Sequence, residues 1–314
     1  MKKIIKLGIP VFTIITFATV FLIYTGSYYR ADPSAVSALL SDQMVTVAQT
    51  EYGWFFDGPS ENKALVFYPG AKVEETAYAP LLHLLAEQAM DVCLVKMPFH
   101  LALFGSNKAD DVMALYDYDS WYIGGHSLGG AMAANYAAKK GTPLNGVILL
   151  AAYPTKALDS GLLLISIYGS EDGILNMDQL SQGIQFAPDN YKNYVIEGGN
   201  HAGFGNYGEQ AGDGSAYISA KEQQSQTVGE QAAIKRKEER KEYMEKLQES
   251  DKSDIQKTDS AEISEEGKEI LKNNAQEDGA FVMVENTDKK MYTSEGKLIS
   301  LEAGVVSVDA KVGE

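Results

Sequence analysis

The segment that most constrains the fold is a strand-like run, followed at once by a glycine-flanked serine and a helix-forming run. Residues 120–123 have the aromatic and β-branched composition of a buried strand, and residues 131–140 are alanine-rich without glycine or proline. Between them lies the pattern Gly-x-Ser-x-Gly, centred on Ser127. A sharp strand-to-helix turn strains the backbone of its serine, so side chains at Gly125 and Gly129 would collide there. The pattern therefore predicts a nucleophile elbow at Ser127, against the alternative of a structural glycine-rich turn.

A serine hydroxyl needs an adjacent base, and that base is oriented by a carboxylate. Where a serine stands on such an elbow, the acid and then the histidine follow it along the chain. Of four histidines only His201 follows Ser127, and it lies in the glycine-rich loop 198–205 after a strand-like run at 191–196. His201 is therefore the predicted base, the alternative being a loop histidine that hydrogen-bonds locally.

The acid is expected in the turn after the apolar run 162–169, which reads as a buried strand. Asp172 lies in that turn, where its carboxylate can reach an imidazole. Glu171 is expected to point elsewhere from a tight turn, and Asp189 comes later, after a helical segment. The position of Asp172 between serine and histidine favours a catalytic role over that of an ordinary turn aspartate before glycine.

The oxyanion of an acyl-transfer intermediate needs two backbone N–H donors. The first is expected from Leu128, directly after the serine. The second is expected from Ala71, because the strand-like run 64–68 leads into Pro69-Gly70-Ala71 and Gly70 allows the backbone to approach a substrate closely. An everyday Pro-Gly turn is the alternative interpretation.

The apolar loop at 97–104 is a candidate substrate-contacting segment. Together with Gly70, we expect Met97 and Phe99 to line an acyl pocket or to belong to a small lid. A hydrophobic loop packed on the core explains the same composition equally well.

Three further side chains are expected to have structural roles. His83 lies in an amphipathic run at 78–87 and is expected on the surface of that helix. His126 is expected to pack beneath the elbow, because its side chain points away from that of the serine. Cys93 is the single cysteine, so it forms no internal disulfide and reads as a buried small hydrophobe. No cysteine–histidine cluster suggests a metal.

Taken in order, the motifs resemble those of bacterial α/β-hydrolase fold proteins related to dienelactone hydrolases and carboxylesterases. The resemblance covers about residues 31–228 and rests on residues 68–73, 77–81, 94–98, 124–130, 168–173 and 198–205. It implies an α/β fold, with a mostly parallel sheet flanked by helices on both faces and the elbow after a central strand. It also implies hydrolysis of carboxylic esters without a cofactor. Two departures limit it: Ser127 replaces the cysteine nucleophile of dienelactone hydrolases, and Ala71 stands where a second glycine is common.

The resulting hypothesis is a serine hydrolase that uses Ser127, Asp172 and His201 on a small-molecule or lipid-like ester. A peptidase or thioesterase would use the same triad. A non-catalytic binding module on this fold is the alternative from another class, and such modules usually lose a triad member.

Residues 1–30 are predicted to form a membrane anchor. Lys2, Lys3 and Lys6 precede an uncharged apolar stretch at 7–24, and Arg30 is the first charge after it. At about 1.5 Å per residue, such a helix just crosses a bilayer core of roughly 30 Å. The lysines place the N-terminus in the cytoplasm and the hydrolase domain outside. A cleaved signal peptide, giving a secreted protein, is the alternative.

The composition changes after the predicted hydrolase domain at 31–228. Residues 229–275 are charged and polar and are expected to form a solvated helix and a flexible linker. Residues 276–314 regain apolar alternation at 280–284, 297–301 and 305–308, which is typical of a small β-rich module. The net charge of −16 argues against nucleic-acid binding and against unaided binding to anionic lipid.

Overall fold

The computed structural model describes residues 15–16, 19–21, 23–59, 62–88, 90–139, 141–229, 291–292 and 298–299. The chain divides into two units, Met1–Glu242 and Tyr243–Glu314. In the second unit the described residues are the antiparallel strands β9 (Met291–Tyr292) and β10 (Leu298–Ile299). The strand predicted at 297–301 contains β10, and those at 280–284 and 305–308 lie outside the described residues, as does nearly all of the linker predicted at 229–275.

An eight-stranded sheet organises the first unit, in the order β1-β2-β4-β3-β5-β6-β7-β8. Strands β4 to β8 and β3 run parallel, whereas β1 and β2 add an antiparallel edge. The strands are β1 (Thr46–Thr50), β2 (Gly53–Asp57), β3 (Lys63–Tyr68), β4 (Asp91–Val95), β5 (Ser120–His126), β6 (Gly146–Leu150), β7 (Leu163–Gly169) and β8 (Asn190–Ile196). The strand that leads into Ser127, β5, lies between β3 and β6, so the elbow follows a central strand as predicted.

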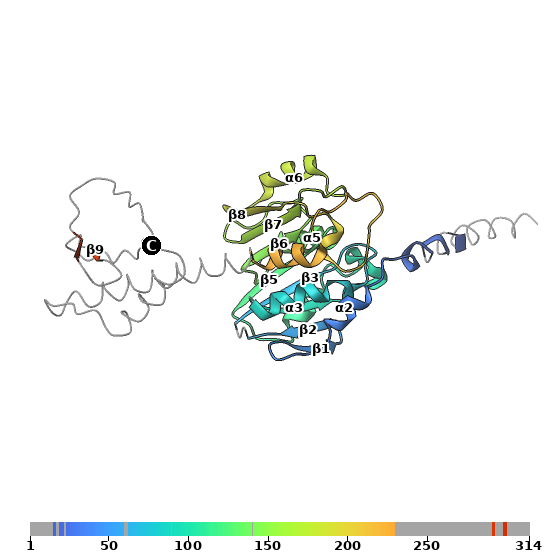
Figure 1. The fold of residues 1–314 in the computed structure, drawn as a ribbon, viewed down its shortest axis with the longest axis horizontal. Coiled ribbons are helices and arrows are strands. Elements are labelled where there is room, and N and C mark those ends of the chain that lie inside the picture. The colour runs from blue at the N-terminus through green and yellow to red at the C-terminus, as the bar shows by residue number, and fades with distance from the viewer. Residues whose placement is uncertain are drawn as a thin grey trace, which may run out of the picture. The chain divides into compact units, whose positions relative to one another are not determined.

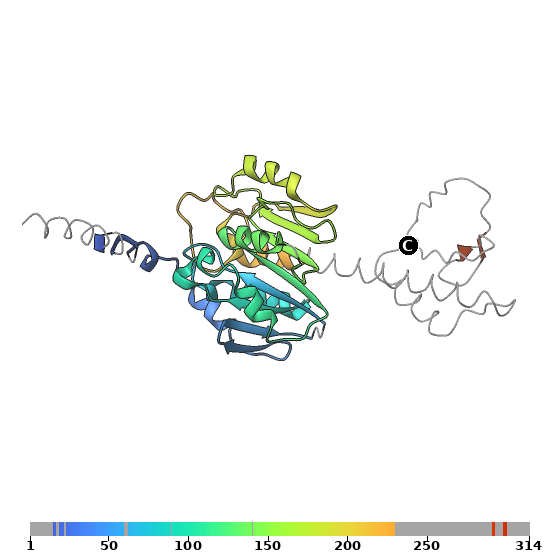
Figure 2. The ribbon, with the colours of Figure 1, turned by 180° about the vertical axis from the view of Figure 1, so that it is seen from behind.

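Helices cover both faces of this sheet (Figures 1 and 2). The α-helices are α2 (Pro33–Ser37), α3 (Ala79–Gln88), α4 (Lys108–Met113), α5 (Leu128–Ala137) and α6 (Met177–Gly183). Short 3₁₀ helices are η1 (Glu75–Tyr78), η2 (Pro98–His100), η3 (Ala102–Phe104), η4 (Ile184–Phe186) and η5 (Ala202–Phe204). Residues 220–229 are also helical, as are the described residues between 15 and 26.

The core consists of two apolar layers, one on each face of the sheet. In β3, Leu65 and Phe67 pack with α3 on one face, while Ala64 and Val66 pack with α4 and α5 on the other. Both sets are fully buried, which explains why the central strands are continuous apolar runs rather than alternating ones. The predicted α/β fold, with a mostly parallel sheet flanked by helices, is confirmed.

The N-terminal anchor falls largely outside the described part of the chain. Among the described residues, no helix combines the length and the apolar character that crossing a membrane requires. The predicted span at 7–24 includes many residues outside this part, so the anchor stays a prediction.

Candidate active site

The backbone at Ser127 has the geometry of the predicted elbow. Ser127 lies between the end of β5 and the first residue of α5, with φ 53° and ψ −124°, in the left-handed region that non-glycine residues rarely adopt. A Cβ on Gly125 would lie 2.5 Å from the carbonyl oxygen of Tyr68, and one on Gly129 would lie 2.2 Å from the same oxygen. Both glycines are therefore required by close backbone packing, and the predicted strand-to-helix turn is present.

Asp172 and His201 come together at the carboxyl edge of the sheet. Nδ1 of His201 lies 2.8 Å and 3.0 Å from the two carboxylate oxygens of Asp172, and each side chain is only 1% exposed. Oδ1 of Asp172 also accepts the N–H groups of Ile174 and Leu175, at 2.9 and 2.7 Å. Because a carboxylate can only accept, this pairing fixes the proton of the neutral imidazole on Nδ1. It leaves the lone pair of Nε2 free for a proton.

The ring of His201 lies next to the residue that precedes Ser127, and one of its nitrogens is free of partners among the described residues. Within the described part of the chain, its Nε2 is buried and has no hydrogen-bond partner. The ring of His126, the residue before Ser127, has its centroid 4.5 Å from that of His201. The structure thus brings the predicted acid and base together, with the base against the residue that precedes the predicted nucleophile.

The loop after β3 offers one free amide, at the predicted position. The N–H of Gly70 donates to the hydroxyl of Tyr78, 3.1 Å away, and is therefore engaged. No hydrogen bond within the described residues engages the N–H of Ala71 or of Leu128. A Cβ on Gly70 would lie 2.7 Å from the Tyr78 hydroxyl, so this glycine permits the close contact that holds the loop. Ala71 and Leu128 remain the candidate oxyanion donors.

His126 packs beneath the elbow as predicted, and Tyr78 holds it there. The Tyr78 hydroxyl lies 2.8 Å from Nδ1 of His126, and both side chains are buried. Burial, and then the neighbouring His201, hold the pKa of His126 well below its usual value. Burial likewise raises the pKa of Tyr78. Sequence reasoning gave no role to Tyr78, although it lies in one of the motifs on which the resemblance rests.

Two polar residues that brace the histidine loop were missed by sequence reasoning. Asp213 accepts the N–H groups of His201 (3.2 Å), Ala202 (2.8 Å) and Gly173 (3.1 Å), so it joins the histidine loop to the acid loop. Gln223, fully buried in the last described helix, pairs with both the N–H and the carbonyl of Asn200. Neither residue belongs to a periodic or motif-like pattern, so no sequence signal marks it.

The loop at 97–104 divides between the core and the surface. Met97 is buried in the core layer that contains Tyr68, whereas Phe99 is 48% exposed and has φ 55°. The carbonyl of His100 accepts the N–H of Lys72, the residue after Ala71, at 2.8 Å. The loop therefore borders the oxyanion loop, and the roles of Met97 and Phe99 in substrate binding stay predictions.

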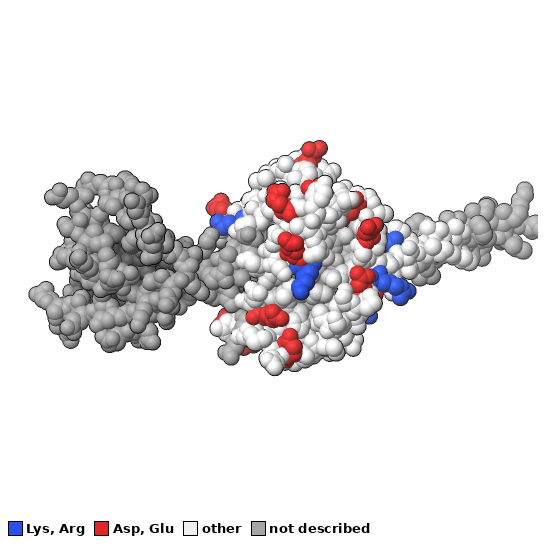
Figure 3. Space-filling model, in the orientation of Figure 1, with Lys and Arg blue, Asp and Glu red and all other residues white. Residues whose placement is uncertain are grey.

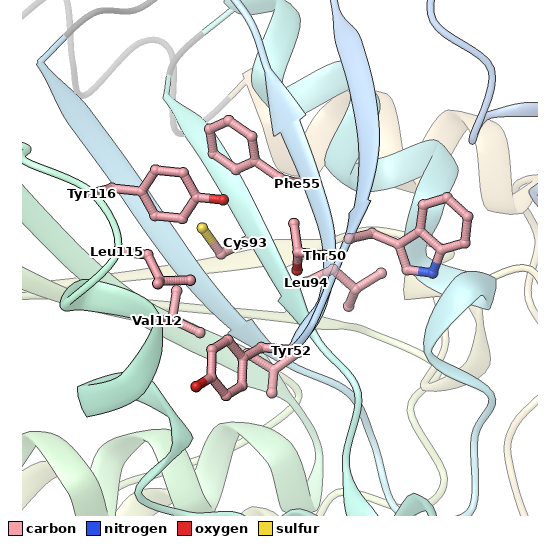
Figure 4. A pocket seen from close by; sticks show the side chains of 10 residues that line it. Thr50, Tyr52, Phe55, Cys93, Leu94, Val112, Leu115 and Tyr116 are labelled. Carbon is pink, nitrogen blue, oxygen red and sulfur yellow. The ribbon is translucent and has the colours of Figure 1, made fainter.

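A small cavity lies away from these residues, between β2, β4 and the end of α4 (Figure 4). Its volume is about 10 Å³, close to the minimum for one water molecule. Cys93 lines it and is buried as predicted, which raises the pKa of its thiol. None of Ser127, Asp172 and His201 lines this cavity, so it is separate from the candidate active site.

His83 differs from its predicted position on a helix surface. It is 8% exposed, because residues 38–42 fold over α3 and use both of its ring nitrogens. Nδ1 lies 2.9 Å from the carbonyl of Ala38, and Nε2 lies 3.0 Å from Oδ2 of Asp42.

Asp42, His83 and Glu87 form a group whose possible metal-ligand atoms lie within 4.8 Å of one another. The N–H groups of Val45 and Met44, and then His83, lower the pKa of Asp42 to about 2. The group already has a structural role as a clasp between the two segments.

Comparison with known proteins identifies the family. Residues 64–225, just over half of the chain, match the model of the alpha/beta hydrolase family. A search of curated proteins found no match. Similar solved structures include a carboxylesterase from Bacillus subtilis, 8% identical with a TM-score of 0.39, covering 54% of this chain and 88% of that one. A CIB-like hydrolase from Thermoplasma acidophilum is 11% identical with a TM-score of 0.45, covering 60% and 99%. Carboxyl esterase 2 from Tuber melanosporum is 10% identical with a TM-score of 0.45, covering 65% and 90%. These likenesses concern the fold, and by the family match the chain belongs to the alpha/beta hydrolases.

Proposed function

We propose that this protein is a serine hydrolase that cleaves carboxylic esters through Ser127, His201 and Asp172. The observation that carries the proposal is the state of His201. Its Nδ1 is paired with a buried carboxylate, while its buried Nε2 has no partner among the described residues. Nε2 of His126 is also buried without a partner among the described residues, but its Nδ1 contacts the Tyr78 hydroxyl rather than a carboxylate. The combination seen in His201, a carboxylate on Nδ1 and an unpartnered Nε2, is the one that a general base beside a serine on an elbow requires.

In the proposed reaction, Oγ of Ser127 attacks the ester carbonyl and Nε2 of His201 takes its proton. Asp172 holds the imidazole by Nδ1–H and stabilises the imidazolium that forms. The N–H groups of Leu128 and Ala71 bind the tetrahedral oxyanion. His201 then returns the proton to the leaving alcohol, and water hydrolyses the acyl-enzyme by the same steps in reverse order. Apart from the substrate and this water, the steps use only groups of the chain.

The cellular location forms part of the proposal. The apolar stretch at 7–24, with lysines before it and Arg30 after it, supports a single-pass anchor with a cytoplasmic N-terminus and an extracytoplasmic hydrolase domain. The substrates that fit this arrangement are small-molecule or lipid-like esters at the outer face of the membrane. Extraction of the full-length chain from membranes by detergent, but not by carbonate or salt, is the expected behaviour. Release by salt alone would contradict the anchor.

The test is labelling of the full-length chain in detergent with a fluorophosphonate probe, beside Ser127→Ala and Ser106→Ala. Ser106 is another half-buried serine and is outside the proposed triad. We expect labelling of the wild type and of Ser106→Ala, and none of Ser127→Ala. Equal labelling of all three proteins would overturn Ser127 as the nucleophile, and no labelling of a well-folded wild type would overturn the proposal in favour of a binding module. A panel of esters, thioesters and peptides of matched acyl group then separates esterase from thioesterase and peptidase activity.

A further inference from the structure

The segment that follows the proposed anchor is attached to the oxyanion loop. The N–H of Tyr29 donates to the carbonyl of Lys72 (2.7 Å), and the N–H of Glu74 donates to the carbonyl of Tyr29 (2.9 Å), forming a parallel bridge. The N–H of Ala31 donates to the carboxylate of Glu74, 3.1 Å away. Since Lys72 directly follows Ala71, this segment lies against the loop that offers a candidate oxyanion donor.

The same segment is also attached to the chain that follows His201. The N–H of Asp32 donates to the carbonyl of Asn206 (2.8 Å), and the hydroxyl of Tyr29 accepts the N–H of Ala211 (3.3 Å). The rings of Tyr29 and Tyr207 have centroids 5.6 Å apart. Residues 29–32 therefore form a strap between the two sides of the candidate active site. The helix before the strap is held at the active-site edge of the domain rather than on a free linker.

Aromatic side chains join that helix to the loop at 97–104. The ring of Phe21 contacts the rings of Phe99 and Phe104 edge-on, with centroids 5.2 and 5.9 Å apart. Phe99, Phe104 and the neighbouring Leu103 are 48%, 50% and 62% exposed, and Ile23 on the helix is 68% exposed. These residues make an apolar surface that continues from the helix onto the loop. In water a surface of this kind is unfavourable, and it marks a binding region.

This apolar loop adjoins the helix that follows the nucleophile as well as the oxyanion loop. Its second half, η3, packs against α5, the helix that begins directly after Ser127. Its first half is hydrogen-bonded to Lys72 through the carbonyl of His100. A molecule lying along the apolar loop would therefore reach the candidate active site from the side of the anchor.

Three cations among the described residues border this apolar surface, with the carboxylates of Glu74 and Glu75 nearby, in a chain whose net charge is −16. Arg30 lies over the ring of Tyr28 at 5.2 Å, and Nζ of Lys72 lies over the ring of Tyr24 at 4.4 Å. Nζ of Lys108 donates to the carbonyl of Lys96 next to the loop, and Figure 3 shows basic side chains where the N-terminal helix meets the domain. Tyrosine rings and cations bordering an apolar helix are typical of the interface between a bilayer and water.

We propose that this face rests on the membrane surface and that Ser127 cleaves acyl esters of membrane lipids, which enter along residues 97–104. The inference rests on the proposed esterase function and anchor, and it adds the substrate class and the direction of entry. The strap fixes the orientation, the exposed aromatic and aliphatic side chains enter the acyl region, and the cations meet lipid phosphates.

The position of the face can be tested without catalysis. The full-length chain is placed in nanodiscs of phosphatidylcholine and phosphatidylglycerol, with an environment-sensitive dye attached through Leu103→Cys or, as the control, Ile184→Cys. Cys93 is buried and does not compete for the dye. Ile184 is 52% exposed but precedes β8 at the opposite edge of the sheet. We expect blue-shifted emission at position 103 only, quenched by brominated acyl chains. Equally water-like emission at both positions would overturn the proposal.

Activity separates the failure of this inference from that of the esterase function. The wild type, Leu103→Glu and Ile184→Glu are compared on phosphatidylglycerol vesicles and on a soluble short-chain ester. We expect the ratio of vesicle to soluble activity to fall about tenfold in Leu103→Glu, since a charge is placed in the acyl region, and to be unchanged in Ile184→Glu. Cleavage of the soluble ester but not of the lipid by the wild type would overturn the inference alone. Absence of both activities would overturn the esterase function itself.

Discussion

Two regions border Ser127, and they are built in opposite ways. The side chains of Asp172 and His201 are buried, and the backbone of their loops is fixed by the carboxylate of Asp213 and the amide of Gln223. The loop at 97–104 instead exposes apolar side chains to the surroundings. Proton transfer requires fixed geometry, which many hydrogen bonds supply, whereas contact with an apolar substrate requires accessible surface. The difference suggests that chemistry and substrate access are assigned to separate sides of the site.

The largest expected effect is a loss of activity in Asp172→Asn, on the side of the site whose loops are held by hydrogen bonds. The variant keeps the shape of the side chain but no longer fixes the tautomer of His201, so we expect kcat to fall by about 10⁴. Asp189→Asn is the matched control, because Asp189 also lies between serine and histidine in the chain but is exposed. Steady-state kinetics on a soluble ester check both. A loss in Asp189→Asn equal to that in Asp172→Asn would contradict the assignment of the acid.

A smaller loss of activity is expected from Asp213→Asn, which tests whether the hydrogen bonds that hold the histidine loop also position the base. Its carboxylate binds the backbone N–H groups of His201 and Ala202, so weakening it displaces the base, and a misplacement of about 1 Å costs roughly 100-fold. We expect kcat to fall by about that factor, with KM changed little. Asp159→Asn, on an exposed loop, is the control. An effect on KM or thermal stability alone would show that Asp213 does not position His201.

The two regions are also expected to differ in stability. Gln223→Ala leaves the half-buried N–H and carbonyl of Asn200 without their partner, which costs about 2 kcal/mol of unfolding free energy. Phe104→Ala removes a half-exposed ring, and we expect a loss below about 1 kcal/mol. Denaturant unfolding of both variants in the same detergent measures the difference. Equal losses of unfolding free energy in the two variants would contradict the distinction between the hydrogen-bonded loops and the exposed loop at 97–104.

The smallest expected effect concerns His126, which packs beneath the elbow against His201. Its pKa is held well below 6.5 by burial, so below pH 6.5 the unfolded chain binds a proton that the folded chain does not. Its contribution to stability is therefore fully present above pH 6.5 and decreases as the pH falls. We expect the melting temperature of the wild type to fall more steeply between pH 7 and 5.5 than that of His126→Asn. Parallel curves would contradict a buried, neutral His126.

The central strands and the elbow could be predicted because their local composition reflects their burial. β3, β5 and β7 were predicted to within a few residues, since strands covered on both faces are continuous apolar runs ended by glycine or polar turns. The edge strand β8 was also predicted to within a residue, although its residues are mostly exposed. Like β3, β6 is a continuous apolar run, although no strand was predicted there. The antiparallel strands β1 and β2 have exposed, mixed faces and gave no such signal.

The order of the motifs along the chain, rather than any periodicity, identified Asp172 and His201. Tyr78, Asp213 and Gln223 could not be found in that way, because each acts through hydrogen bonds to the backbone of another loop rather than through a motif. A buried glutamine in an exposed-looking polar helix, or an aspartate in a glycine-rich loop, has no distinctive sequence pattern. His83 was misplaced for the same reason, since the segment that covers it comes some forty residues earlier.

The most direct test of the account is to find where the acyl group is held during turnover. The full-length enzyme is quenched during reaction with a slowly hydrolysed ester, digested, and the acyl mass is located by tandem mass spectrometry. The account predicts the acyl group on Ser127, with greater accumulation in Asp213→Asn if deacylation slows more than acylation. Turnover with the acyl group on another residue, or with no acyl-enzyme at all in the wild type, would contradict Ser127 as the nucleophile.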